Sequence, residues 1–168
     1  MEKITFEIII PHLLRAEGGY VNNVLDRGGE TNMGISKRAY PNEDIKNMTA
    51  KRATQIYLDI WERSNVQLLP EPLRYIVFDM VVNSGANAAV RCLQRTCGMK
   101  FTDGKIGTFT AKCCEGITLT DFYNARLTFY NNIVKRNPTQ SIFLDGWKTR
   151  LNRVVDFSLN LLNDIKCS

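Results

Sequence analysis

An apolar helical stripe that ends in a glutamate is the feature that most constrains this chain. Apolar side chains near the N-terminus recur at the i, i+3, i+4, i+7, i+8 spacing of one buried helix face, at Phe6, Ile9, Ile10, Leu13 and Leu14. Glu17 extends the same stripe beyond Leu14. An apolar environment favours the protonated carboxyl, the form that can donate a proton near neutral pH. We therefore interpret Glu17 as a candidate general acid.

Two glycine pairs predict how the chain folds around Glu17. Gly18-Gly19 follows it directly, and Gly28-Gly29 comes ten residues later. Glycines tolerate positive φ and mark helix ends and turns, so we predict a helix end, then short extended strands between Tyr20 and Ile35. This hairpin would return over the end of the helix. A plainer interpretation also stays open, in which Glu17 is a solvated carboxylate paired with Arg15.

Motifs along nearly the whole chain carry a resemblance to a known family. The residues concerned are Glu17–Tyr20, Asn23, Asp26, Gly28–Asn32, Gly34–Ser36, Phe78–Gly85, Leu93–Gln94, Asp103–Gly107, Gly146–Trp147, Arg150 and Asn152–Val154. They resemble glycoside hydrolase family 108, the peptidoglycan-cleaving, lysozyme-like endolysins of phages and bacteria. The family usually has an aromatic residue where Met33 stands, a proline at Thr108 and a proline at Arg27, and none of these departures replaces a proposed catalytic group.

The resemblance implies roles for three residues in breaking a glycosidic bond. Glu17 would be the acid, Asp26 would orient a water or stabilise positive charge, and Thr31 would position the water. Asn32 stays open as the alternative to Thr31 at this third position. A pair of carboxyls is sufficient for this chemistry, and the distance between them decides whether configuration is retained or inverted. Glu30 is a rival second carboxylate, with a salt bridge to Arg27 as its equally weighted structural role.

Four further polar residues are candidate sugar contacts. They are Tyr20, Asn32, Asn83 and Gln94, which offer an aromatic face or amide hydrogen bonds. Asn83 has an alternative role as a helix cap, because it stands just before Ser84-Gly85. We place Trp61 and Trp147 in the core and interpret Asp79 as a buried, paired structural charge.

The periodicity predicts a mainly α fold with a small hairpin against its helices. The resemblance implies that this is a lysozyme-like helical domain with a small β-hairpin over an active-site cleft. We expect one domain over residues 1–168, with the catalytic signature in 1–90 and a helical part in 91–168 that resembles a peptidoglycan-binding segment. The first of the later predicted helices has Thr49 as its N-cap. The others span about Leu73–Val82, Ala86–Cys97, a long stretch that is capped by Thr120 or Asp121 and ends before Asn137-Pro138, and about Ile142–Ile165.

Charge and composition indicate which classes of binding partner suit this chain. The net charge is +5 with an isoelectric point near 9.0, which suits an anionic polymer. The basic residues are scattered among acids and form no nucleic-acid motif, so we expect no nucleic-acid partner. No apolar run is long enough for a transmembrane helix or a secretory signal, so we expect no stable membrane insertion and synthesis in the cytoplasm.

The cysteines favour reduced thiols. Five of them, an odd number, cannot all pair within the chain: Cys92, Cys97, Cys113, Cys114 and Cys167. Cys92 and Cys97 are five apart on a predicted helix, a poor geometry for a bridge, and buried reduced thiols made in the cytosol are the expectation. With no Cys-x-x-Cys spacing and a single histidine, we predict no metal site and no cofactor.

The sequence therefore predicts a monomeric N-acetylmuramidase that hydrolyses the β-1,4 links between N-acetylmuramic acid and N-acetylglucosamine in peptidoglycan glycan strands. A lytic transglycosylase using Glu17 alone, and a non-catalytic module that binds peptidoglycan or assists secretion, stay open as alternatives. We expect action at the cell wall or periplasm, reached through a holin pore.

Overall fold

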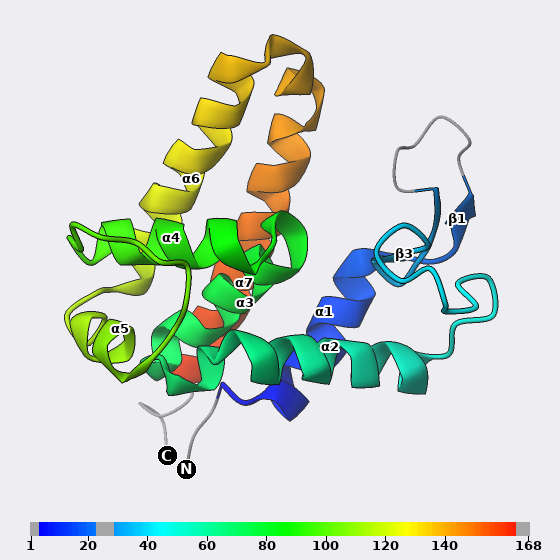
Figure 1. Cartoon of the computed structure of the whole chain (residues 1–168), viewed down its shortest axis with the longest axis horizontal. Coiled ribbons are helices and arrows are strands. Elements are labelled where there is room, and N and C mark those ends of the chain that lie inside the picture. Colours follow the sequence, from blue (N-terminus) through cyan, green and yellow to red (C-terminus); the bar gives the residue numbers. More distant parts are fainter. Residues whose placement is uncertain (1–3, 23–28, 164–168) are drawn as a thin grey trace. The chain divides into compact units, whose positions relative to one another are not determined.

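The computed structural model describes residues 4–22 and 29–163, and within these ranges the chain forms two compact units. Of the described residues, one unit comprises 6–22 and 29–60, and the other comprises 4–5 together with 61–163. The fold is mainly helical with a small antiparallel sheet, as predicted (Figure 1). A single domain over residues 1–168 stays a prediction.

The unit of residues 6–60 opens with α1 (Phe6–Glu17), whose buried face is the predicted apolar stripe. The chain then forms a three-stranded antiparallel sheet in the order β1 (Val21–Asn22), β2 (Glu30–Asn32), β3 (Ile35–Ser36). The pairs Val21 with Thr31 and Asn32 with Ile35 give its register. The predicted extended segment is confirmed, and a third strand adds a second hairpin to it.

Helix α2 (Ala50–Ser64) follows the sheet. Thr49 is its N-cap, as predicted, because the Thr49 Oγ1 accepts a 3.2 Å hydrogen bond from the Arg52 amide. Tyr57 and Trp61, two of its aromatic residues, are almost fully buried. The core position predicted for Trp61 is therefore confirmed.

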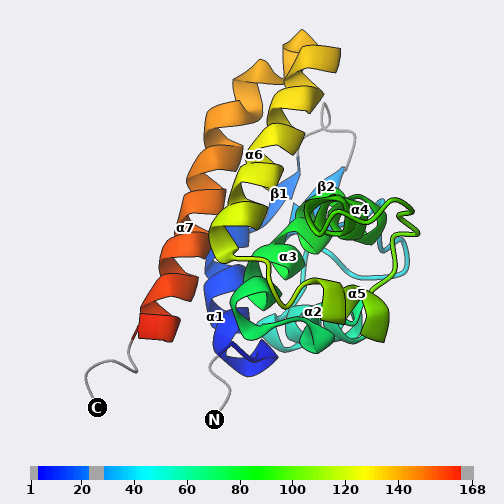
Figure 2. The ribbon, with the colours of Figure 1, turned by 90° about the vertical axis from the view of Figure 1, so that its left-hand side faces the viewer.

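The second unit is built around α3 (Glu71–Ser84), the predicted central helix. It is buried on nearly all sides and packs against α4 (Ala86–Thr96), α6 (Leu119–Arg136) and α7 (Leu144–Asn163). Helices α6 and α7 lie side by side as an antiparallel pair (Figure 2). A short α5 (Thr108–Cys113) and the 3-10 helices η1 (Val66–Leu68) and η2 (Pro138–Phe143) complete this unit.

Two helix boundaries and one short helix differ from the sequence expectation. The N-cap of α6 is Thr118 rather than Thr120 or Asp121, because Thr118 and Asp121 form a reciprocal capping box. Helix α5 was not predicted, since six residues are too few to show a helical period. The chain from Pro138 to Phe143 is a 3-10 helix, so α7 begins at Leu144.

A buried ion pair network stabilises the centre of the second unit. Asp79 on α3 is fully buried and accepts a 2.6 Å hydrogen bond from Arg126 and a 2.8 Å hydrogen bond from Arg150. Arg126, also fully buried, donates as well to the Ile76 carbonyl and the Tyr130 hydroxyl. The prediction that Asp79 is a paired structural charge is confirmed. The network joins α3, α6 and α7.

Across residues 4–22 and 29–163, no helix combines the length and the apolar character that crossing a membrane requires.

Candidate active site

Glu17 is the last residue of α1, as the sequence predicts. Its side chain is half-buried, and Gly18 follows with a φ of +75°, a conformation that glycine adopts without strain. The chain therefore leaves the helix directly after the carboxyl-bearing residue. This geometry holds Glu17 at the junction of α1 and the sheet.

The turn between β2 and β3 lies directly against Glu17. Met33 and Gly34 connect the paired residues Asn32 and Ile35, and both have positive φ, +49° and +77°. Such two-residue turns match the twist of a hairpin. A Cβ atom on Gly34 would lie 2.5 Å from Glu17 Oε2 and 2.7 Å from its Cδ. A residue with a Cβ at this position would therefore have to displace the Glu17 carboxyl, and glycine leaves it in place.

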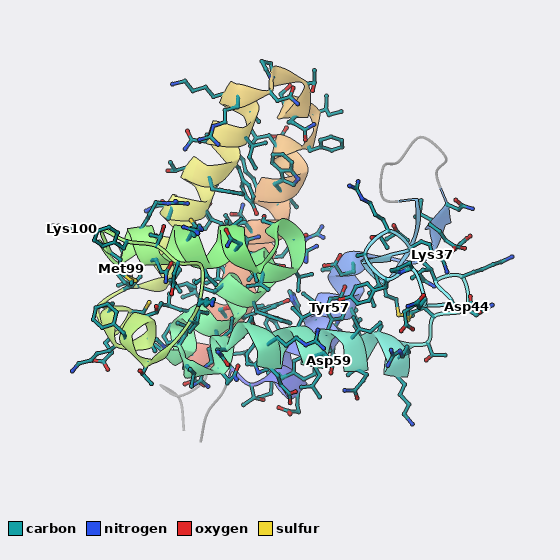
Figure 3. The ribbon with its side chains drawn as sticks, in the orientation of Figure 1. Lys37, Asp44, Tyr57, Asp59, Met99 and Lys100 are labelled. Carbon is teal, nitrogen blue, oxygen red and sulfur yellow. The ribbon has the colours of Figure 1, made fainter. Side chains whose placement is uncertain are left out.

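Tyr57 on α2 completes the surroundings of this turn (Figure 3). Its hydroxyl donates a 2.7 Å hydrogen bond to the Met33 carbonyl, and the same hydroxyl lies 2.5 Å from the position of a Gly34 Cβ. The Glu17 carboxyl and the Tyr57 hydroxyl thus meet at one face of Gly34. Helices α1 and α2 and the β2–β3 turn together fix the position of Glu17.

The predicted site residues Thr31 and Asn32 of β2 differ in burial. Thr31 is half-buried, and its hydroxyl donates to the Gly29 carbonyl at 3.4 Å. Asn32 is 7% exposed, and its amide donates to the carbonyls of Ile45 and Lys46 at 3.0 and 3.5 Å. Asn32 therefore ties the sheet to the loop before α2, and a sugar contact through it stays a prediction.

Tyr20, which precedes β1, and Glu30, the first residue of β2, form a hydrogen-bonded pair. The Tyr20 hydroxyl donates a 2.9 Å hydrogen bond to Glu30 Oε1, and this bond raises the pKa of Tyr20. Tyr20 is 41% exposed, so its ring is available to a ligand. Asp26, the predicted partner of Glu17, lies outside the described residues.

Asn83 and Gln94 lie in the other unit. Asn83, near the end of α3, donates a 2.7 Å hydrogen bond to the Asp79 carbonyl and lines a pocket of about 260 Å³ with Tyr130, Trp147 and Arg150. Trp147 is half-buried there and packs against Tyr130 and Phe143. The core position predicted for Trp147 is therefore wrong, because this side chain is only partly buried and lines the pocket.

Gln94 is 1% exposed, and its side chain forms hydrogen bonds with the loop before α5. Its amide nitrogen donates to Asp103 at 2.6 Å, to the Lys105 carbonyl at 3.1 Å and to Thr110 at 3.3 Å, and its oxygen accepts from the Gly104 amide at 3.0 Å. The bond from Gln94, followed by the one from the Lys105 amide, lowers the pKa of Asp103. These contacts organise the loop, and binding of substrate by Gln94 stays a prediction.

Comparison with known proteins identifies both halves of the chain. A model of glycosyl hydrolase 108 matches residues 10–85, and a model of a predicted peptidoglycan domain matches residues 88–152. The solved structure of Brucella abortus SagA is similar over 94% of this chain and 95% of its own, with 30% sequence identity and a TM-score of 0.80. The chain belongs to the glycosyl hydrolase 108 family. Curated protein sequences give no match.

Membership in the glycosyl hydrolase 108 family supports a glycoside hydrolase with a lysozyme-like fold that acts on peptidoglycan. Glu17, Gly34 and Tyr57 all lie within the residues that the family model matches. Within the part of the chain that the structure describes, no group of three or more His, Cys, Asp or Glu side chains is placed to hold a metal ion.

Sequence reasoning did not identify Gly34 and Tyr57 as parts of this site. Gly34 belongs to the motif that carries the family resemblance, but no pattern of neighbouring residues indicates that its missing side chain makes room for Glu17. The apolar period places Tyr57 on the buried face of its helix. A buried tyrosine must find a partner for its hydroxyl, and this was the available signal that Tyr57 contacts polar backbone.

Proposed function

We propose that this protein is an N-acetylmuramidase that hydrolyses the β-1,4 bond between N-acetylmuramic acid and N-acetylglucosamine, with Glu17 as the general acid. The proposal rests on the position of the Glu17 carboxyl, which lies close against Gly34 and beside the Tyr57 hydroxyl. A positioned acid is what cleavage of a glycosidic bond requires, because the leaving oxygen must be protonated as the bond breaks.

The environment of Glu17 suits an acid that must hold one orientation. The backbone of Gly34 closes one side, and Tyr57 holds that turn in place through its bond to Met33. Preorganised groups of this kind act without rearrangement during the reaction. Glu17 is half-buried as a residue, so it is not sealed off from solvent and from an approaching sugar chain.

A second polar group must stabilise the cationic sugar or deliver the water. We propose Asp26 for this role and Thr31 as the hydroxyl that orients the water. Thr31 supports the proposal through its half-exposed position on β2. The rival carboxylate of Glu30 already accepts a hydrogen bond from the Tyr20 hydroxyl, which favours a structural role for Glu30.

The substrate class rests on the second half of the chain. Residues 88–152 match a predicted peptidoglycan domain, and the chain carries a net charge of +5. Peptidoglycan bears peptide carboxylates, so a basic protein is attracted to it. We propose that Tyr20, Asn32, Asn83 and Gln94 contact the glycan strand.

The decisive experiment digests purified peptidoglycan with wild type and with Glu17→Gln, followed by mass spectrometry of the soluble fragments. Glu7→Gln is the matched control, because Glu7 is an exposed glutamate in the first turn of the same helix. We expect Glu17→Gln to lose at least about 100-fold in rate, the usual contribution of general acid catalysis. Glu7→Gln should retain wild-type activity and both variants should keep the wild-type circular dichroism spectrum.

The fragments also separate the alternatives. Reducing ends that carry oxygen from labelled water support hydrolysis, whereas anhydro sugars would show a lytic transglycosylase. Binding to sacculi without any loss of turbidity would show a non-catalytic wall-binding module. Wild-type activity in the Glu17→Gln variant would overturn the proposed role of Glu17.

We propose that the protein acts on the wall after release from the cytoplasm through a holin pore. Expression with and without a co-expressed holin tests this route. Lysis that needs the holin supports it, and lysis of equal extent without one contradicts it.

A further inference from the structure

The ends of α4 and α5 bring two thiols into contact. Cys97 follows the last residue of α4 and Cys114 follows the last residue of α5, and their sulfur atoms are 3.0 Å apart. Both cysteines are reduced in this structure, with Cys97 half-buried and Cys114 fully buried. A disulfide bond is about 2.05 Å long, so the two sulfurs need to approach by only about 1 Å to form one.

We propose that Cys97 and Cys114 form a disulfide when the protein enters an oxidising compartment, and that this bond locks the loop between α4 and α5. The compartment rests on the proposed function, which takes the protein from the cytosol to the cell wall. The formation of the disulfide itself depends only on the contact between the two thiols. The sequence analysis expects reduced thiols in the cytosol, and it did not include this pair because its members are 17 positions apart.

The surroundings of the two thiols indicate which of them attacks the oxidant first. The hydrogen bond with Cys114 lowers the pKa of Cys97, whereas the bond to Cys97 and burial raise the pKa of Cys114. Cys97 is also the more accessible of the two. The thiolate is the attacking species, so Cys97 is the first nucleophile.

The oxidant is a disulfide such as oxidised glutathione or a disulfide oxidoreductase. The Cys97 thiolate attacks one oxidant sulfur, forms a mixed disulfide and releases the other sulfur as a thiolate. Cys114 then gives up its proton, attacks Cys97 Sγ and displaces the second oxidant sulfur. The two thiol protons pass to the two released thiolates, so two protein thiols are oxidised and one oxidant disulfide is reduced.

The bond would close a loop that shapes a large pocket. The segment from Met99 to Thr110 forms much of the wall of a pocket of about 740 Å³, and Met99 and Lys100 at its start are labelled in Figure 3. Gln94 organises the middle of this segment through Asp103 and Lys105. A covalent bond between the two flanking helix ends would hold both ends of the loop together.

The effect on stability follows from the length of the loop. A crosslink that closes a loop of about 15 residues restricts the unfolded chain enough to raise Tm by roughly 6–12 °C in a protein of this size. The lock should therefore appear as a redox-dependent Tm. It should also disappear when either member of the pair is replaced.

The test uses the full chain, equilibrated in glutathione buffers from fully reduced to strongly oxidised and then alkylated. Trypsin cuts after Arg95, Lys100, Lys112 and Arg126, so the bond would join the peptides 96–100 and 113–126. Cys113→Ser is the matched control, because it removes the neighbouring thiol and leaves Cys114. We expect the joined peptide and the higher Tm in wild type and in Cys113→Ser, and neither in Cys97→Ser or Cys114→Ser.

Three results would overturn the proposal. They are full alkylation of Cys97 and Cys114 in oxidised wild type, a joined peptide that persists in Cys114→Ser, and a bond that forms without raising Tm. Wild type and Cys113→Ser decide the matter even if Cys114→Ser fails to fold. None of these measurements needs a wall substrate, so a protein that forms the bond but cleaves no peptidoglycan would refute the proposed function and leave this inference standing.

Discussion

Replacing Gly34 with alanine tests the close contact on which the candidate active site depends. The added Cβ would lie 2.5 Å from Glu17 Oε2, whereas ordinary contact begins at 3.4 Å, so the carboxyl must move by roughly 1 Å. A misplacement of that size costs about 100-fold in rate, or about 2.7 kcal/mol of barrier. The positive φ of +77° adds a folding cost of about 1–2 kcal/mol for a residue with a Cβ.

Gly29→Ala separates these two effects. Gly29 has a similar φ of +68°, but a Cβ there would meet nothing within 4 Å. Both variants should lose stability in urea unfolding because of the positive φ, and Gly34→Ala should lose more because its Cβ is also crowded by Glu17 and Tyr57. Only Gly34→Ala should lose about 100-fold in the rate of peptidoglycan clearing. Equal activity in the two variants would refute the claim that Gly34 positions Glu17.

Tyr57→Phe provides a further check on the same contact. It removes the hydroxyl that lies 2.5 Å from the added Cβ, and with it one of the two crowded groups. Adding Gly34→Ala to Tyr57→Phe should then cost less stability than adding it to wild type, a coupling that a double-mutant cycle measures. Activity should stay low in the double variant, because the alanine still displaces Glu17. Additive stability losses would contradict the geometry.

Three further variants test the second unit. Asp79→Asn should lower the free energy of unfolding by about 3–5 kcal/mol in urea titrations, because it leaves the buried charge of Arg126 uncompensated. Thr118→Ala should lower it by about 1 kcal/mol, since the capping box of α6 is lost. Asp103 has a pKa below its usual range in the folded protein, so its contribution to stability is present near neutral pH and is lost as the pH falls through that lowered pKa. Asp103→Asn should therefore lose stability at neutral pH and show a weaker decline in Tm between about pH 5 and pH 3 than wild type.

A control substitution accompanies two of these variants, and a refuting result can be stated for the third. Asp156→Asn changes an exposed carboxylate on α7 and should leave stability within about 0.5 kcal/mol of wild type. Thr128→Ala replaces a threonine inside α6 that caps nothing, and it should not reproduce the loss seen for Thr118→Ala. A parallel acid decline of Tm in wild type and Asp103→Asn would show that the Gln94 contact does not carry the pH dependence.

Much of the helical fold was predictable because its signals are local. These local signals include the apolar stripe of α1, the N-cap Thr49 and the run of apolar residues in α3. Each of them depends only on residues that are close together in the sequence. The end of α1 at Glu17 followed from Gly18 in the same way. Boundaries that depend on competing caps, as at Thr118, could not be decided, because several nearby residues can serve the same purpose.

The sequence alone determined the family, the helical class and the candidate acid Glu17, because a long motif and a helical period are properties of neighbouring residues. The tertiary structure decided what surrounds that acid. It placed the bare face of Gly34 and the hydroxyl of Tyr57 against the Glu17 carboxyl, and it brought Cys97 to Cys114. These contacts join residues 17 to 40 positions apart, and only the packing of helices and turns in three dimensions selects such partners.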